Sequence, residues 1–249
     1  TGYTSHISVG NAAFLAVGAY STGWLANNAG LPLFVTIPLA GLITAAVGMI
    51  FGIPSLRLRG LYLAMATLAA HFIIEFVIVH WESATGGVNG LSIPAETIFG
   101  FEFSNDRSLF YLIYILVIVF ALFATNLFRT KVGKAFVAIR DQDISAEVMG
   151  VNIFKYKLLA FGVSSFYVGV AGSLMAYQAQ IISPENFPIT VAIDYLAMII
   201  IGGLGSILGS ILGAIFVTGL PEILRLITTA LSGYYPDLVG LFASIKMGV

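Results

Sequence analysis

The chain has 249 residues, of which 59% are hydrophobic and 9% are charged, and its mean hydropathy is +0.99. Soluble domains carry about 25% charged residues, so this composition predicts an all-α fold, a polytopic bundle of transmembrane helices. The formal net charge of −1, the absence of Cys and three scattered His residues argue against nucleic-acid binding, disulfides, thiol catalysis and a metal site. We expect one transmembrane domain over residues 1–249, with no cofactor.

Hydrophobic runs of about 20 residues, the length that crosses the hydrocarbon layer, recur along the chain. They cover residues 8–27, 33–54, 61–80, 108–128 and 157–178. Arg57 and Arg59 lie in the turn after the second run, which places that turn in the cytoplasm by the positive-inside rule. The acidic loop at about 81–107 is then predicted to lie outside the cell.

In the middle of the third run, His71 and Glu75 are ionisable residues that stand one helical turn apart. Ionisable groups inside a span are costly and are therefore candidates for function. Two interpretations stay open: the pair stabilises a helix contact, or it faces a translocation path. Asn11, near the start of the first run, is a further candidate for the path.

An island of charge at about 129–157 separates the fourth and fifth runs and holds six basic and three acidic residues. Its basic excess predicts that it lies in the cytoplasm. Lipid headgroups could bind the basic residues. The acidic residues would repel an anionic lipid surface, so we favour a protein partner that docks on this loop.

The island also contains signals for two short helices. Thr130 is expected to cap a helix over 131–140, and Asp141 a second helix that runs to Met149 and ends at Gly150. Apolar surface is expected from Ile139, Ile144 and Val148. A spacing of three or four residues predicts one shared face for Arg140, Asp143, Glu147 and Gly150.

Region 190–221 is too long for one span and is interrupted by the sequence GGLGS at 202–206. We expect a piece over 190–202, too short to cross the membrane, and a second piece over 207–221 that ends at Pro221. The break is either a Gly-rich turn between closely packed helices or a broken helix on a substrate route. Candidates for that route are Asp194, Gly203 and Gly205.

Several motifs agree in order and spacing with one known family. They are GYTSHISVGNAAFLAVGAY (2–20), LRGLYLAMATL (58–68), TGGVNGL (85–91), GKAFVAIRDQDISAEVMGVNIFKYKLLAF (133–161) and LAMIIIGGLGSILGSILGA (196–214). In combination they resemble the permease subunits of ABC importers for branched-chain amino acids, the LivM-like branch best, over nearly the whole chain. Members of that family usually carry further spans at both ends, so we interpret the chain as partial.

The resemblance implies a permease subunit with no active site, in a bacterial or archaeal cytoplasmic (inner) membrane. It would form the translocation path with a second, homologous permease subunit. ATP-binding cassette subunits would lie under the cytoplasmic loops, and an extracytoplasmic solute-binding protein would deliver a small polar solute. The coupling helix that fits the ATPase would contain Arg140, Asp143, Ala146, Glu147 and Gly150. The family pattern differs at Phe72 and Glu75, so it assigns no role to the His71–Glu75 pair.

Other functions remain open from the residues alone. A stand-alone secondary carrier would use His71 and Glu75 as an ion relay, and a membrane scaffold would transport nothing. An importer permease for urea or amides would share the same motifs. The chain lacks the GxxxxGK[ST] loop, so ATP hydrolysis is expected on separate subunits rather than on this one.

Overall fold

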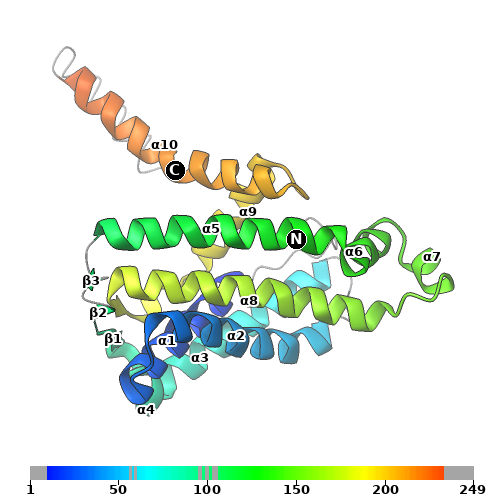
Figure 1. The fold of residues 1–249 in the computed structure, drawn as a ribbon, viewed down its shortest axis with the longest axis horizontal. Coiled ribbons are helices and arrows are strands. Elements are labelled where there is room, and N and C mark those ends of the chain that lie inside the picture. The colour runs from blue at the N-terminus through cyan, green and yellow to red at the C-terminus, as the bar shows by residue number, and fades with distance from the viewer. Residues whose placement is uncertain are drawn as a thin grey trace. The chain divides into compact units, whose positions relative to one another are not determined.

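The computed structural model describes residues 10–55, 58, 61–94, 97–98, 101–102 and 106–232. Most of these residues are helical, which confirms the predicted all-α class (Figure 1). Within the described ranges, six helical segments are long and apolar enough to cross a membrane, as expected of a multi-pass membrane protein. These are Leu33–Pro54, Tyr62–His80, Arg107–Arg129, Ile153–Ala179, Pro184–Gly202 and Ile207–Leu226.

The helices fall into two compact units that divide between Ile193 and Asp194, so the single domain over 1–249 stays a prediction. The long helices of the first unit are α1 (Asn11–Ala29), α2 (Leu33–Ser55), α3 (Leu61–His80), α5 (Asp106–Arg129) and α8 (Ile153–Ala179). Its short helices are α4 (Glu82–Thr85), α6 (Lys131–Asp141), α7 (Asp143–Val148), η1 (Gly87–Asn89) and η2 (Pro184–Asn186). Helices α9 (Ile189–Gly202) and α10 (Ile207–Ser232) follow.

The core of the first unit is built where α8 packs against α1 and α2. Small residues let the backbones approach closely: a Cβ on Gly18 would overlap the backbone of Gly169, and a Cβ on Gly172 would overlap that of Leu15. Hydroxyl groups add hydrogen bonds between the helices. Thr22 Oγ1 donates to Ser173 Oγ at 2.7 Å, and the hydroxyls of Thr36 and Tyr177 lie 2.6 Å apart.

Helix α1 corresponds to the predicted first span, but it is not one of the six apolar segments. Its sequence is rich in Ala, Gly, Ser, Thr and Asn, and it packs against α2, α3 and α8. A helix covered by protein needs small residues for close packing more than it needs an apolar surface for lipid. That α1 spans the membrane therefore stays a prediction, and residues 8 and 9 of the predicted run lie outside the described ranges.

The two ends of the first unit differ (Figure 1). At one end, two residues of β1 (Leu91–Ser92) pair antiparallel with β4 (Ile181–Ile182), and Asn27 Nδ2 of α1 donates to the carbonyl of Ser92 at 2.8 Å. A second ribbon, also not predicted, pairs β2 (Thr97–Ile98) with β3 (Phe101–Glu102). Helices α6 and α7 lie at the other end. The described parts of loops 81–107 and 129–157 therefore lie at opposite ends of the first unit, and the side of the membrane that each loop faces stays a prediction. Arg57 and Arg59 fall outside the described residues.

The second unit contains the predicted Gly-rich break. Gly203 and Gly205 separate α9 from α10 with positive φ angles of 99° and 86°, which confirms that the helix is broken here. Beyond the break the helices touch through glycine: a Cβ on Gly202 would overlap the carbonyl of Gly209, and one on Gly213 that of Met198.

The predicted piece 190–202 matches α9, which has 14 residues from Ile189 to Gly202. Together with η2, however, it forms an apolar segment of 19 residues, Pro184–Gly202, which is long enough to cross a membrane, so the prediction that this region is too short to cross is wrong. One predicted boundary is also wrong. The second piece does not end at Pro221, because α10 continues to Ser232 with Pro221 inside it. Membrane helices tolerate an internal proline when neighbouring groups satisfy the freed carbonyl.

Candidate coupling loop and polar residues of the spans

Helices α6 and α7 follow the predicted positions, but their N-terminal caps differ. Thr130 precedes α6, yet its hydroxyl donates backwards to the carbonyl of Leu127 at 2.6 Å instead of capping α6. Asp141 is the last residue of α6, and Gln142 takes the N-cap position of α7. Thr130 therefore takes the predicted N-cap position without making a capping hydrogen bond, and the prediction that Asp141 caps α7 is wrong.

The C-terminal end of α7 is the predicted one. Gly150 adopts φ 84°, and its N–H donates to the carbonyl of Glu147 at 2.9 Å. The N–H of Val151 donates to the carbonyl of Ala146 at 3.0 Å. These two bonds define a Schellman motif, which ends a helix with glycine in the left-handed conformation. Gly150 thus fixes the direction in which the chain leaves α7 toward α8.

The expected common face of Arg140, Asp143, Glu147 and Gly150 does not form. Gln142 is extended (φ −156°, ψ 106°), so the residues before and after it belong to different helices. A spacing of three or four residues places side chains on one face only within a single helix, so Arg140 does not share a face with the other three residues. Asp143 instead accepts a hydrogen bond from Lys157 Nζ of α8 at 2.9 Å, in a pair that is largely buried. Arg140 Nε donates to Asp141 Oδ1 at 3.0 Å.

Of the apolar residues expected on the loop, two are exposed and one is not. Ile139 is buried on α6, whereas Ile144 is 75% exposed and Val148 84% exposed. Met149 is also 84% exposed. Together with the exposed carboxylate of Glu147, these residues form what we call the α7 tip (Ile144, Glu147, Val148 and Met149). Ala146, predicted to contact a partner, is instead buried at 3% exposure and packs inside the loop.

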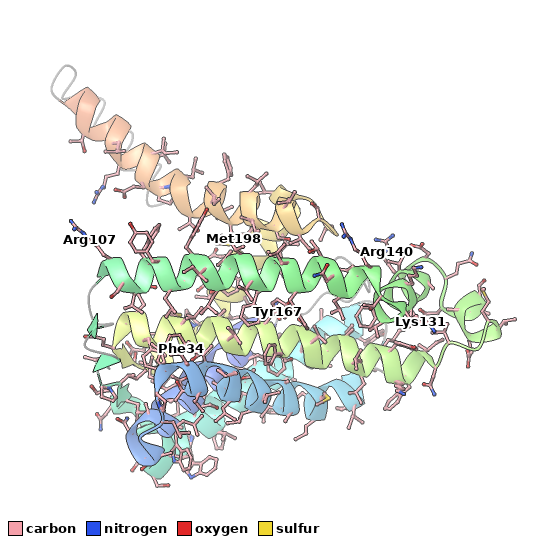
Figure 2. All side chains as sticks on the ribbon, viewed as in Figure 1. Phe34, Arg107, Lys131, Arg140, Tyr167 and Met198 are labelled. Carbon is pink, nitrogen blue, oxygen red and sulfur yellow. The ribbon has the colours of Figure 1, made fainter. Side chains whose placement is uncertain are left out.

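Exposed basic side chains lie on α6, the helix that precedes α7. Lys131, at the start of α6, and Arg140, near its end, are both exposed and lie at the α6 end of α5, opposite Arg107 (Figure 2). A groove of about 500 Å³ lies next to the tip and is bounded by Glu147, Lys157 and the segment from Gly150 to Phe154. The loop therefore offers exposed apolar side chains, both signs of charge and a groove, which is the chemistry of a protein-docking surface.

His71 and Glu75 do come together on α3. His71 is 2% exposed and its Nε2 lies 3.7 Å from Glu75 Oε2, while the Glu75 side chain is 48% exposed. Asn11 is half-buried at the first residue of α1, the helix that packs on α3. Asp194, Gly203 and Gly205 belong to the second unit, in which Asp194 is exposed on α9.

Comparison with known proteins identifies the family. The family model described as "Branched-chain amino acid transport system / permease component" matches residues 1–247. The chain belongs to this family. It is 36% identical over 248 residues to the "High-affinity branched-chain amino acid transport system permease protein LivM" of Salmonella typhimurium, a match that covers 90% of this chain and 58% of that protein. The LivM protein of Escherichia coli gives the same identity and coverage.

A more distant relative carries the same designation. A "Probable branched-chain amino acid transport permease protein LivM" of Methanocaldococcus jannaschii is 27% identical over 186 residues, which cover 74% of this chain and 53% of that protein. No solved structure matches the chain significantly. The chain thus spans less than two thirds of the length of these LivM relatives, and its resemblance to the permease family is confirmed.

The structure singles out two residues that the sequence analysis did not, Lys157 and Tyr20. In the sequence Lys157 is only one of six basic residues of the loop, and its partner Asp143 lies 14 positions earlier, a separation that no local spacing rule predicts. Tyr20 looked like an ordinary span residue, but its hydroxyl is buried and has no hydrogen-bond partner within the described part of the chain. No sequence pattern distinguishes such a tyrosine from one in an apolar core.

Proposed function

We propose that the protein is a membrane-spanning permease subunit of an ABC importer and forms part of the translocation path for a small polar solute. The observation that carries this proposal is the family match over residues 1–247. The names of the LivM relatives make branched-chain amino acids the first candidate solutes. The protein would itself catalyse no reaction and would sit in a bacterial or archaeal inner membrane.

The α7 tip supports an ATP-binding cassette subunit as the partner on the island side of the membrane. Three large apolar side chains are exposed at the tip, and an exposed apolar patch is typical of a surface that a partner covers. The carboxylate of Glu147 among them disfavours contact with anionic lipid. The Asp143–Lys157 pair and the Gly150 Schellman motif hold the tip in one position. A rigid tip can pass movement of an ATPase to α8. In this proposal Glu147 and Gly150 face the ATPase, Arg140 lies beside it, and Asp143 and Ala146 position the tip.

The remaining partners follow from the proposed importer. A second, homologous permease subunit would complete the path, with Asn11, His71, Glu75, Asp194, Gly203 and Gly205 as candidate path residues. A solute-binding protein would dock at the opposite end of the first unit, near the β1–β4 ribbon. That ribbon and the backbone around Gly90 (φ 76°) give this end a fixed shape.

The experiment that tests the function is reconstitution. The full-length subunit is co-expressed with the ATPase, permease and binding-protein genes encoded beside it, purified and placed in liposomes. We expect a stable complex and ATP-dependent uptake of leucine, isoleucine or valine. Uptake of urea or ribose in place of these amino acids would contradict the choice of solute, and ion-driven uptake without any ATPase would contradict the importer itself.

A substitution at the α7 tip tests the docking surface. Val148→Asp places a charge in the proposed interface, so we expect loss of ATPase co-purification and of uptake, with normal membrane insertion because Val148 makes few contacts within the subunit. Ala138→Asp, an exposed position on α6, adds the same charge outside the tip and serves as the matched control. Equal ATPase association in both variants would place the interface elsewhere.

A further inference from the structure

An apolar groove of about 410 Å³ follows three helices of the first unit, α1, α2 and α3, and we call it the α1–α2–α3 groove. Its floor consists of buried side chains, Tyr20 of α1 and Ile74 and Ile78 of α3. Its walls are exposed, because Ile43 on α2 and Val77 on α3 are 40% and 44% exposed. The groove is therefore open, and a group from outside these helices must fill it.

The groove results from the way in which the three helices pack. Both α2 and α3 pack on α1, and they make fewer contacts with each other than either makes with α1. Ser21 of α1, a half-buried residue with a short side chain, lines the space that remains. The gap between α2 and α3 thus belongs to the packing of the first unit.

The lining of the groove excludes a charged ligand. Among the described residues that line it, none carries a charge. The hydroxyl of Thr85, at one end, already donates to the carbonyls of Ile78 and Trp81 at 2.6 and 2.8 Å. The ammonium and carboxylate groups of an amino acid would find no ionic partner here, and an unpaired buried charge is costly. The groove therefore fits an apolar ligand better than a polar solute.

The length of the groove matches one leaflet of a bilayer. Its lining spans residues 43–51 of α2 and 73–81 at the end of α3, and each stretch covers about 12 Å at 1.5 Å per residue. Half of the hydrocarbon layer is about 15 Å thick. Trp24 and Trp81 line the groove and are 44% and 58% exposed, and tryptophan is enriched at the membrane–water interface. These two residues place one end of the groove at the level of the lipid headgroups.

The size of the groove selects a single hydrocarbon chain over a further helix. A helix with its side chains is about 10 Å across and would occupy roughly 900 Å³ over 12 Å, more than twice the volume of the groove. A hydrocarbon chain is much thinner than a helix and can enter. The walls also belong to apolar segments that can cross a membrane, Leu33–Pro54 and Tyr62–His80, so the groove continues the surface that lipid covers.

We propose that the α1–α2–α3 groove binds one acyl chain of a phospholipid, whose headgroup lies at the level of Trp24 and Trp81. The chain fills the gap between α2 and α3. This inference goes beyond the proposed transport function and requires only the membrane-spanning helices. Its failure would leave the permease function intact.

The two tryptophans of the chain, Trp24 and Trp81, provide the test because both line the groove. The full-length subunit, purified with the partners that remain bound to it, is placed in nanodiscs of phosphatidylcholine with ordinary or brominated acyl chains. Bromine quenches tryptophan fluorescence on contact, and comparison with Trp24→Phe isolates the emission of Trp24. We expect the brominated chains to quench most of this emission. An absence of quenching would show that protein covers the groove and would overturn the proposal.

A variant that fills the groove locates the chain. Ser21→Phe places a large side chain in the groove, so we expect most of the quenching of Trp24 to be lost. Ser164→Phe, at an exposed position of α8 outside the groove, is the matched control and should keep the quenching of the unmodified protein. Equal quenching in the two variants would mean that lipid reaches Trp24 by another route, which would overturn the site. Val47→Phe fills the groove from α2 and replaces Ser21→Phe if that variant fails to assemble.

Discussion

Lys157 connects α8 to the first residue of α7 through its hydrogen bond with Asp143. The side chains are 10% and 23% exposed, so water screens the pair only partly. Asp143 also lies at the positively polarised end of α7, which favours a carboxylate there. This contact helps to hold a helix of only six residues in position beside α8.

The first prediction concerns this pair. Lys157→Met leaves the Asp143 carboxylate without its cation, so we expect the opening free energy of α7 to fall by about 1–3 kcal/mol. Hydrogen–deuterium exchange of residues 143–150 measures that opening. Lys155→Met, two residues away and exposed, is the control and should stay within about 0.5 kcal/mol of the unmodified protein.

A double variant sharpens the comparison. Asp143→Asn combined with Lys157→Met removes both charges, so part of the lost protection should return, because the largely buried negative charge is removed together with the positive charge of Lys157. Equal exchange rates in Lys157→Met and Lys155→Met would show that the pair does not hold α7.

Among the elements, α9 and α10 depend on glycine for two separate reasons. Gly203 and Gly205 supply positive φ angles at the break. Gly202, Gly209 and Gly213 let the two helices touch backbone to backbone. The turn between α9 and α10 therefore requires residues that adopt a positive φ angle. The contact between the two helices requires residues that have no side chain.

The second prediction separates a glycine that is needed for packing from one that is not. In Gly213→Ala the new methyl group meets the carbonyl of Met198, so we expect a loss of about 1–3 kcal/mol and a lower melting temperature of the purified complex. Gly219→Ala, six residues along α10, meets nothing within 4 Å and should be neutral or stabilising by up to about 1 kcal/mol.

Gly203→Ala should also lower the stability of the complex, but through backbone strain rather than through a steric overlap. No atom lies within 4 Å of the added Cβ, but φ of 99° is strained for any residue with a side chain, by about 1–3 kcal/mol.

The comparison of Gly213→Ala with Gly219→Ala has a clear contrary outcome. If the two variants melt at the same temperature, the helices do not cross at these glycines in the membrane.

The sequence predicted most elements but few of the contacts between them. Hydrophobic runs located α2, α3, α5 and α8, and glycines located the break, because length and backbone conformation are local properties. The shared face on the charged loop failed at a single residue, Gln142, whose extended backbone interrupts the helical period. The Asp143–Lys157 pair joins two helices across 14 residues, and a small cavity beside His71 lies between α1 and α3. No local sequence pattern encodes either of them.

For the whole molecule, the two ends of the first unit must lie on opposite sides of the membrane if α5 crosses it. The chain contains no Cys, so single cysteines report the sides directly. Ser145 on α7 and Ser92 on β1 are both exposed and serve as labelling positions.

The third prediction is the orientation of the subunit. We expect Ser92→Cys to react with an impermeant thiol reagent added to intact cells, and Ser145→Cys to react only after the membrane is opened, because the basic loop stays in the cytoplasm. Labelling of Ser145→Cys from outside would reverse the orientation and remove the basis for an ATPase at the α7 tip.

The hydrogen bond between Thr22 and Ser173 joins positions 151 residues apart. A ribosome adds about 5–20 residues per second, so α1 waits roughly 8–30 s for the helix that will cover it. During that interval the Thr22 hydroxyl has the carbonyl of Gly18 in its own helix, at 2.9 Å, so it is never left unpaired. The glycine face of α1 has no such substitute. A nascent chain that stalls before α8 therefore leaves the face of α1 around Gly18 without the helix that packs on it.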